Sequence, residues 1–320
     1  MAPAFIITID TEGDNLWSRP RTPTTRNAAW LPAFQELAQR HGFRPTWLVN
    51  WEMAHAAPLV EFLRDVLARG AGEVGLHLHA WDTPPLEPLT DDDARHHPFL
   101  GEFPEPILCA KLERLTGVLE EIFQHPLRSH RAGRWALDGR IARWLREHGF
   151  TADCSVCPGV DWRSTKGDPH GPGGPDYRLA PPEPYYLDER DVTKPATHPT
   201  PDALLEVPMT IGAPRLRWLQ PLVDCCSKRH YWLRPNGRNG AALRERVDEA
   251  VAGRHAHLMF VLHSSELMPG GSPTFSDEAS IARLTEDLSA LFAHAQARGC
   301  AGRTLGEFAA EWRAVAKPVL

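Results

Sequence analysis

A regular alternation of strand-like and helix-like segments constrains this chain more than any other feature. Short apolar segments typical of strands lie at about 4–10, 45–49, 73–79, 127–131, 150–156, 204–211 and 256–266. Segments with helical periodicity lie at about 26–41, 57–69, 105–124, 135–149, 240–253, 276–298 and 304–316. Repeated βα units build a mostly parallel sheet. We expect an α/β fold, a distorted (β/α)7 barrel, with an open doubly wound sheet as the alternative.

The alternation stops between about 157 and 203, where the chain is dense in Pro, Gly and Asp. This stretch is too long for an ordinary connection, which favours a functional insertion or lid. With 320 residues and 42% hydrophobic content, the chain can bury a large core. We therefore expect one barrel domain over 1–320 that carries this insertion.

Charge and hydropathy exclude several partners. The net charge of −6 gives no reason to expect nucleic acid or an anionic membrane surface. No apolar run approaches the roughly 20 residues that span a bilayer. The N-terminus runs directly into a strand-like segment without an export signal, which predicts a cytoplasmic protein.

Polar residues with catalytic potential follow the predicted strands. In α/β folds the chemistry lies at the carboxyl ends of the strands. The set comprises Asp10, Glu12 and Asp14 after the first strand, His77 and His79 at the third, Arg131 at the fourth, Asp153 and Ser155 at the fifth, and His263 and Ser264 at the seventh. Each could separately be a cap or a surface residue, but their coincidence at one edge of the sheet predicts a catalytic site.

His77 and His79 stand two apart on a strand, so both side chains project from the same face. Paired imidazoles are half of a metal site, although they could also be hydrogen-bonded histidines in a polar pocket. A carboxylate completing the set would leave open positions on the metal, as catalytic sites do. A second carboxylate as base, a histidine as acid and an arginine that keeps a carboxylate ionised describe metal-assisted hydrolysis of an amide or ester.

The order of these motifs resembles that of the polysaccharide deacetylases, the family 4 carbohydrate esterases. TIDTEGD at 8–14 is similar to their first motif, a strand ending in Thr-Phe-Asp-Asp-Gly, and HLH at 77–79 to their two metal-binding histidines, normally spaced further apart. RAGRW at 131–135 resembles the third motif, and VLH at 261–263 the last. The resemblance spans nearly the whole chain. It implies a distorted barrel that removes N-acetyl groups from amino sugars with one divalent metal ion, usually zinc.

The resemblance also implies roles for individual residues. Asp10 becomes the catalytic base, Arg131 its positioning partner and His263 the general acid. Where the family has a second aspartate as metal ligand, this chain has Thr11, which points to the opposite face from Asp10.

Glu12 lies on the same face as Asp10 and is the candidate ligand in place of Thr11, beside His77 and His79. Alternatively, Asp10 binds the metal and Glu12 is the base. These departures from the family pattern indicate a divergent branch.

Aromatic residues beside the motifs are candidates for substrate contact. Trp81 and Trp135 adjoin motif residues and could stack on a sugar, although core packing would also explain them. Asp153 could line the site and support Arg131, with helix capping or surface exposure as alternatives.

The predicted substrate is therefore an N-acetylated or O-acetylated sugar or glycan. A cytoplasmic enzyme would meet sugar nucleotides, lipid-linked sugars or oligosaccharide intermediates of polysaccharide biosynthesis rather than wall polymer. Two rival hypotheses remain: a metal-independent glycoside hydrolase on a related barrel, and a catalytically inactive sugar-binding protein.

Overall fold

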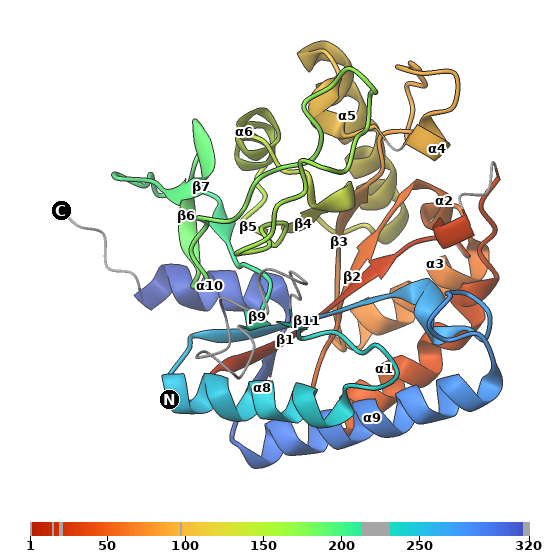
Figure 1. Ribbon diagram of the computed structural model, residues 1–320, viewed down its shortest axis with the longest axis vertical. Helices are drawn as coiled ribbons and strands as arrows, with labels where there is room; N and C mark the ends of the chain where they lie inside the picture. The colour runs from red at the N-terminus through yellow and green to blue at the C-terminus, as the bar shows by residue number, and fades with distance from the viewer. Residues whose placement is uncertain (1, 15, 19–21, 97, 213–230, 316–320) are drawn as a thin grey trace.

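A curled, mostly parallel sheet forms the centre of the molecule (Figure 1). The computed structural model describes residues 2–14, 16–18, 22–96, 98–212 and 231–315. Within these residues, seven parallel strands follow one another in the order β11 (His257–His263), β1 (Ala4–Thr11), β2 (Thr46–Val49), β3 (Glu73–Leu78), β4 (Ser129–Ala132), β5 (Ala152–Asp153) and β8 (Leu205–Glu206). Each coincides, to within one residue at either end or as a shorter piece, with a segment that the sequence predicts to be a strand, which confirms the expected parallel α/β architecture. The strands β5 and β8 are shorter than predicted.

The sheet continues into the insertion. Strands β6 (Tyr185–Asp188) and β7 (Asp191–Pro195) form an antiparallel hairpin that extends the sheet beyond β8. Strand β12 (Ala301–Arg303) pairs with the start of β1. The segment 157–203 is thus partly built into the sheet.

Leu233 draws the two ends of the curled sheet together. Its amide donates to the carbonyl of Thr210, beyond β8, at 3.0 Å, and its carbonyl accepts from the amide of Val261 in β11 at 3.3 Å. The short antiparallel pair β9 (Ile211–Gly212) and β10 (Tyr231–Trp232) lies beside this contact. Single hydrogen bonds replace a full strand ladder here, so the barrel is distorted as expected.

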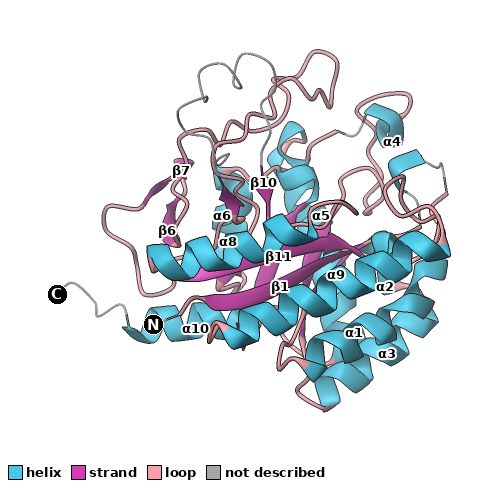
Figure 2. Ribbon diagram, turned by 60° about the horizontal axis from the view of Figure 1, so that its bottom comes forward, coloured by secondary structure: helices cyan, strands magenta, loops and turns pink. Residues whose placement is uncertain are grey.

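Helices cover the outside of the sheet, and α8 and α9 run side by side along β1 and β11 (Figure 2). The longer helices are α1 (Leu31–Arg40), α3 (Ala57–Ala68), α5 (Glu105–Phe123), α6 (Gly139–Glu147), α8 (Gly240–Gly253), α9 (Glu278–Ala297) and α10 (Leu305–Val315). The shorter ones are η1 (Leu16–Ser18), η2 (Arg26–Trp30), α2 (Trp51–Ala54), α4 (Asp93–His96), η3 (Leu100–Glu102), η4 (Gly133–Trp135) and η6 (Ser264–Leu267). No helix among the described residues is long and apolar enough to cross a membrane.

The helix predicted at 135–149 begins later than expected. Asp138 is its N-cap, and its side chain accepts hydrogen bonds from the amides of Arg140 and Ile141, both at 2.9 Å. Arg134 and Trp135 have φ values of +56° and +62°, which no α-helix accommodates. The aromatic residue of RAGRW therefore lies on a tight turn before the helix.

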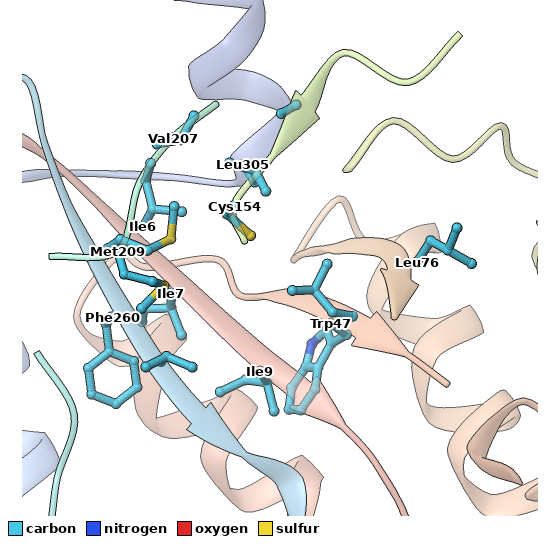
Figure 3. Close-up of a cluster of buried hydrophobic side chains, with 14 of the residues drawn as sticks. Ile6, Ile7, Ile9, Trp47, Leu76, Cys154, Val207, Met209, Phe260 and Leu305 are labelled. Carbon is cyan, nitrogen blue, oxygen red and sulfur yellow. The ribbon is translucent and has the colours of Figure 1, made fainter. Parts of the chain in front are cut away.

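Strand β1 separates two environments. On its outer face, Phe5 packs against Phe260 of β11 and Phe292 of α9, with ring centroids 6.4 and 6.0 Å apart. On its inner face, Ile6 lies near Met209 and Leu305 (Figure 3). Further along this inner face the side chains become polar, because Thr8 and then Asp10 follow at two-residue intervals. The interior of the sheet is thus apolar near the amino ends of the strands and polar at their carboxyl ends.

Candidate active site and metal centre

A buried ion pair joins strands β1 and β4 at the floor of the cluster. Nη1 of Arg131 lies 2.5 Å from Oδ1 of Asp10, and the Arg131 side chain is fully buried. Arg131 also donates to Thr8 Oγ1 at 2.7 Å and to the carbonyl of Cys154 at 3.2 Å. Burial opposes ionisation of Asp10, but Arg131 and two nearby imidazoles lower the pKa of Asp10 to about 2. Asp10 is therefore an oriented carboxylate at neutral pH.

Glu12 and the two histidines of the HLH motif converge beside this pair. Oε1 of Glu12 lies 3.2 Å from Nε2 of His77 and 3.7 Å from Nε2 of His79. All three side chains are buried, and their ligand atoms lie within 4.8 Å of one another. Thr11 points elsewhere, because its hydroxyl donates to the carbonyl of Ile9 at 3.0 Å. The chain thus offers a carboxylate and two imidazoles, as catalytic metal sites do.

Hydrogen bonds and charge suit these three groups to a cation. Nδ1 of His77 lies 2.9 Å from the carbonyl of Arg131, and with Nδ1 as the donor there, Nε2 is the ring nitrogen that can bind a cation beside Glu12. Burial lowers the pKa of His79 to about 3, so this imidazole is neutral. His79 Nδ1 is buried and has no hydrogen-bond partner among the described residues. Despite burial, three histidines lower the pKa of Glu12 to about 2, which makes it an anionic donor. The residues present therefore fit a divalent metal ion.

His263, at the end of β11, faces both carboxylates. Its Nε2 lies 3.7 Å from Oδ2 of Asp10 and 3.6 Å from Oε1 of Glu12. On its other side, Nδ1 lies 2.9 Å from Nη2 of Arg234 and 3.2 Å from Oε2 of Glu266. Glu266 also accepts from the His263 amide at 2.9 Å, so the ring is held from two directions.

The backbone of Glu12 is fixed by two buried polar residues. Ser264 Oγ accepts from the Glu12 amide at 2.9 Å and donates to its carbonyl at 2.8 Å. Asn27 Nδ2 donates to the same carbonyl at 2.7 Å. These contacts hold the loop after β1 in the orientation that aims Glu12 at His77.

The two predicted aromatic residues adjoin the cluster. Trp81 stacks on His79, with ring centroids 4.3 Å apart. The Arg131 guanidinium lies 4.8 Å from the centre of the Trp135 ring. The positive φ of Trp135 is costly for a bulky residue, and backbone strain of this kind clusters at functional sites.

Asp153 lies away from the cluster, contrary to the sequence-based expectation. It pairs with His130 across β4 and β5, so it occupies the face of the sheet opposite to Arg131. It is fully buried, and its oxygens accept from the amide and hydroxyl of Ser155. A side chain enclosed in this way neither lines the site nor supports Arg131. Local sequence pattern does not determine which face of this two-residue strand Asp153 occupies.

Three residues missed by sequence analysis take part in the geometry: Asn27, Arg234 and Glu266. Glu266 carried a detectable signal, because it follows His263 by three residues, a spacing at which its carboxylate can bond back to the histidine amide. Arg234 and Asn27 come from irregular segments with no such pattern.

Comparisons with known proteins show the fold. No protein-family profile and no curated protein matches the sequence significantly. A Parabacteroides distasonis structure designated a glycoside hydrolase/deacetylase superposes with a TM-score of 0.66 and 13% identity, covering 99% of this chain and 72% of that one. A Mycobacterium smegmatis structure designated a polysaccharide deacetylase gives 0.51 and 16%, covering 95% and 97%. A 4-alpha-glucanotransferase of Thermococcus litoralis gives 0.53 and 13%, covering 97% and 40%. The chain therefore has the distorted barrel fold of the polysaccharide deacetylases.

Proposed function

We propose that this protein is a metal-dependent hydrolase that removes an N-acetyl or O-acetyl group from an amino sugar or glycan intermediate. The observation that carries the proposal is the convergence of Glu12, His77 and His79, whose ligand atoms lie within 4.8 Å of one another. Beside them, His263 Nε2 lies 3.7 Å from Asp10 and 3.6 Å from Glu12. The fold shared with named deacetylases supports it.

Each residue has a distinct task in the proposed reaction. Asp10, kept ionised by Arg131, takes a proton from the attacking water. His263, steered by Glu266, gives a proton to the leaving amine or alcohol.

Glu12, His77 and His79 would hold one divalent ion, with zinc the first candidate. When bound, such an ion supplies Lewis acidity toward the acyl oxygen and lowers the pKa of water toward about 7.

The metal content of the purified protein tests whether Glu12, His77 and His79 form a metal site. We expect the purified protein, after incubation with zinc, cobalt or nickel, to bind one equivalent of ion, and His77→Ala to bind none. His125→Ala is the matched control, because His125 is exposed on the protein surface. Absence of bound metal in the wild type, or equal metal in both variants, would contradict the assignment.

Acetate release from N-acetylated oligosaccharides tests the catalytic roles of Asp10 and His263. Asp10→Asn and His263→Ala should each abolish release while metal binding by Asp10→Asn persists. If both variants still release acetate, Asp10 is not the catalytic base and His263 is not the general acid.

Two rivals predict different results. A metal-independent glycoside hydrolase is favoured by the similarity to the glucanotransferase barrel, and its activity would be insensitive to chelators and would yield shorter sugars without acetate. A binding protein without turnover, for which Thr11 in place of aspartate is the argument, would bind sugars after metal loading and release no acetate.

A further inference from the structure

A tryptophan-lined pocket opens beside His263. Its volume is about 470 Å³, and Trp17, Trp135, Trp162 and Trp232 contribute to its wall. The rings of Trp135 and Trp232 are 5.3 Å apart, and those of Trp162 and Trp232 are 6.4 Å apart. An acetyl methyl group needs only a fraction of this space, so the pocket is sized for another part of the substrate.

Two guanidinium groups also line this pocket, those of Arg234 and Arg246. The only acidic residue in its lining among the described residues is Glu266, whose Oε2 already accepts from Arg234 at 3.0 Å and from the His263 amide at 2.9 Å. The lining thus holds two guanidinium groups and one carboxylate in a chain whose overall charge is −6, and Arg246 also pairs with Glu249, outside the lining, at 2.7 Å.

Arg234 is held where it can bind a further anion. Its contacts with Glu266 and His263 both use Nη2, at 3.0 and 2.9 Å. Nε and Nη1 have no acceptor in the part of the chain that the structure describes. The guanidinium also lies 5.5 Å from the centre of the Trp17 ring, within the range of a cation–π contact. Such a fork of donors matches the oxygens of a carboxylate or phosphate.

We propose that this pocket, through Arg234 with Arg246 beside it, selects substrates that carry an anionic group, a carboxylate or a phosphate, next to the acylated sugar. The tryptophan rings cover the apolar faces of the neighbouring sugar or carrier group, and Arg234 binds its charge. The inference rests on the proposed function, since it names the class of substrate for the same site.

Binding by metal-free protein in a chelator tests this selectivity without turnover. The probes are N-acetylglucosamine, its 1-phosphate, and N-acetylmuramic acid, which share one sugar core and differ in charge. By titration calorimetry, we expect at least one anionic probe to bind about tenfold more tightly than the neutral one. A preference for the phosphate indicates a phosphorylated sugar, and a preference for the carboxylate indicates an acidic sugar.

The variants decide whether Arg234 is responsible. Arg234→Met should remove the preference, Arg234→Lys should keep part of it, and Arg246→Met should weaken it. Arg238→Met is the matched control, because Arg238 is an exposed arginine on the same loop and does not line the pocket. Equal binding of all three probes, no binding of either anionic probe, or a preference that survives in Arg234→Met would overturn the inference.

Failure of the inference is distinguishable from failure of the proposed function. If anionic probes bind more tightly but no metal-loaded sample releases acetate, the pocket selects anionic sugars and the protein is not the proposed hydrolase. If acetate is released but anionic probes bind no more tightly than the neutral one, the hydrolase function is supported and the anion selectivity of the pocket is contradicted.

Discussion

Replacing Arg131 with methionine should destabilise the protein by about 3–5 kcal/mol at neutral pH, the usual cost of removing one partner of a buried ion pair. Arg131 is 0% exposed, and its Nη1 lies 2.5 Å from Oδ1 of Asp10. Methionine occupies similar volume but leaves Asp10 buried without its cation, and Thr8 and the carbonyl of Cys154 each lose a donor.

The cost should depend on pH. Despite the opposing effect of burial, Arg131 and two histidines lower the pKa of Asp10 from 3.8 to about 2. A depressed carboxyl pKa contributes stability above the unfolded pKa, here about 2 kcal/mol, which is lost as the pH falls through about 2. In Arg131→Met the pKa of Asp10 rises, so this contribution shrinks or reverses. The difference in stability between wild type and variant should therefore be small near pH 2 and larger at pH 7.

Guanidinium chloride unfolding in a chelator, for wild type, Arg131→Met, Asp10→Asn and the double variant, measures these quantities. The double variant should lose less than the sum of the single losses, by more than about 1 kcal/mol, because the two groups are in contact. Arg238→Met, at an exposed arginine, should leave stability unchanged within about 0.5 kcal/mol. A pH-independent loss for Arg131→Met, together with additive effects, would refute the reasoning.

Three further predictions concern the outer face of the sheet and the packing around the site. Burial and the neighbouring Asp153 carboxylate raise the pKa of Glu206 well above 4.5. The stability of the wild type should therefore fall as the pH rises from about 4.5 toward the pKa of Glu206 in the folded protein. Thermal unfolding over this pH range should show a smaller fall in stability for Glu206→Gln. Thr11 is fully buried and faces away from the site, so Thr11→Asp should cost about 2–4 kcal/mol in denaturant unfolding and leave metal affinity no higher. A Cβ on Gly133 would lie 2.6 Å from Cδ2 of His79 and 2.3 Å from the Leu78 carbonyl, so Gly133→Ala should weaken metal binding in a metal titration, whereas Gly117→Ala, with open space around it, should not.

The strand and helix order could be predicted because it depends on local patterns. The apolar run of β1 and the glycine stops after several helices are visible within a few residues of sequence. Two departures from the expected elements have causes that the pattern did not reveal. The turn at Trp135 needs a positive φ that a helical periodicity hides, and the hairpin β6–β7 forms because it can pair with β8.

The candidate site could be predicted as a set of chemical groups but only partly as an arrangement. Alternation along β1 places Asp10 and Glu12 on one face and Thr11 on the other, and the contacts of these residues agree with that pattern. The same rule could not place Asp153, because the register between β4 and β5 decides which side of the sheet it occupies.

The order of the βα units and the chemistry-bearing residues at the strand ends follow from local patterns in the chain. The contact of Arg234 with His263, and the pocket that Arg234 shares with Trp17 and Trp232, follow only from the folded arrangement of the chain. Hydrophobic periodicity shows which face of a strand or helix is apolar, and it can be recognised within a few residues of sequence. Contacts between irregular loops more than 200 residues apart, such as that of Arg234 with Trp17, depend on how the whole sheet curls and therefore leave no local pattern.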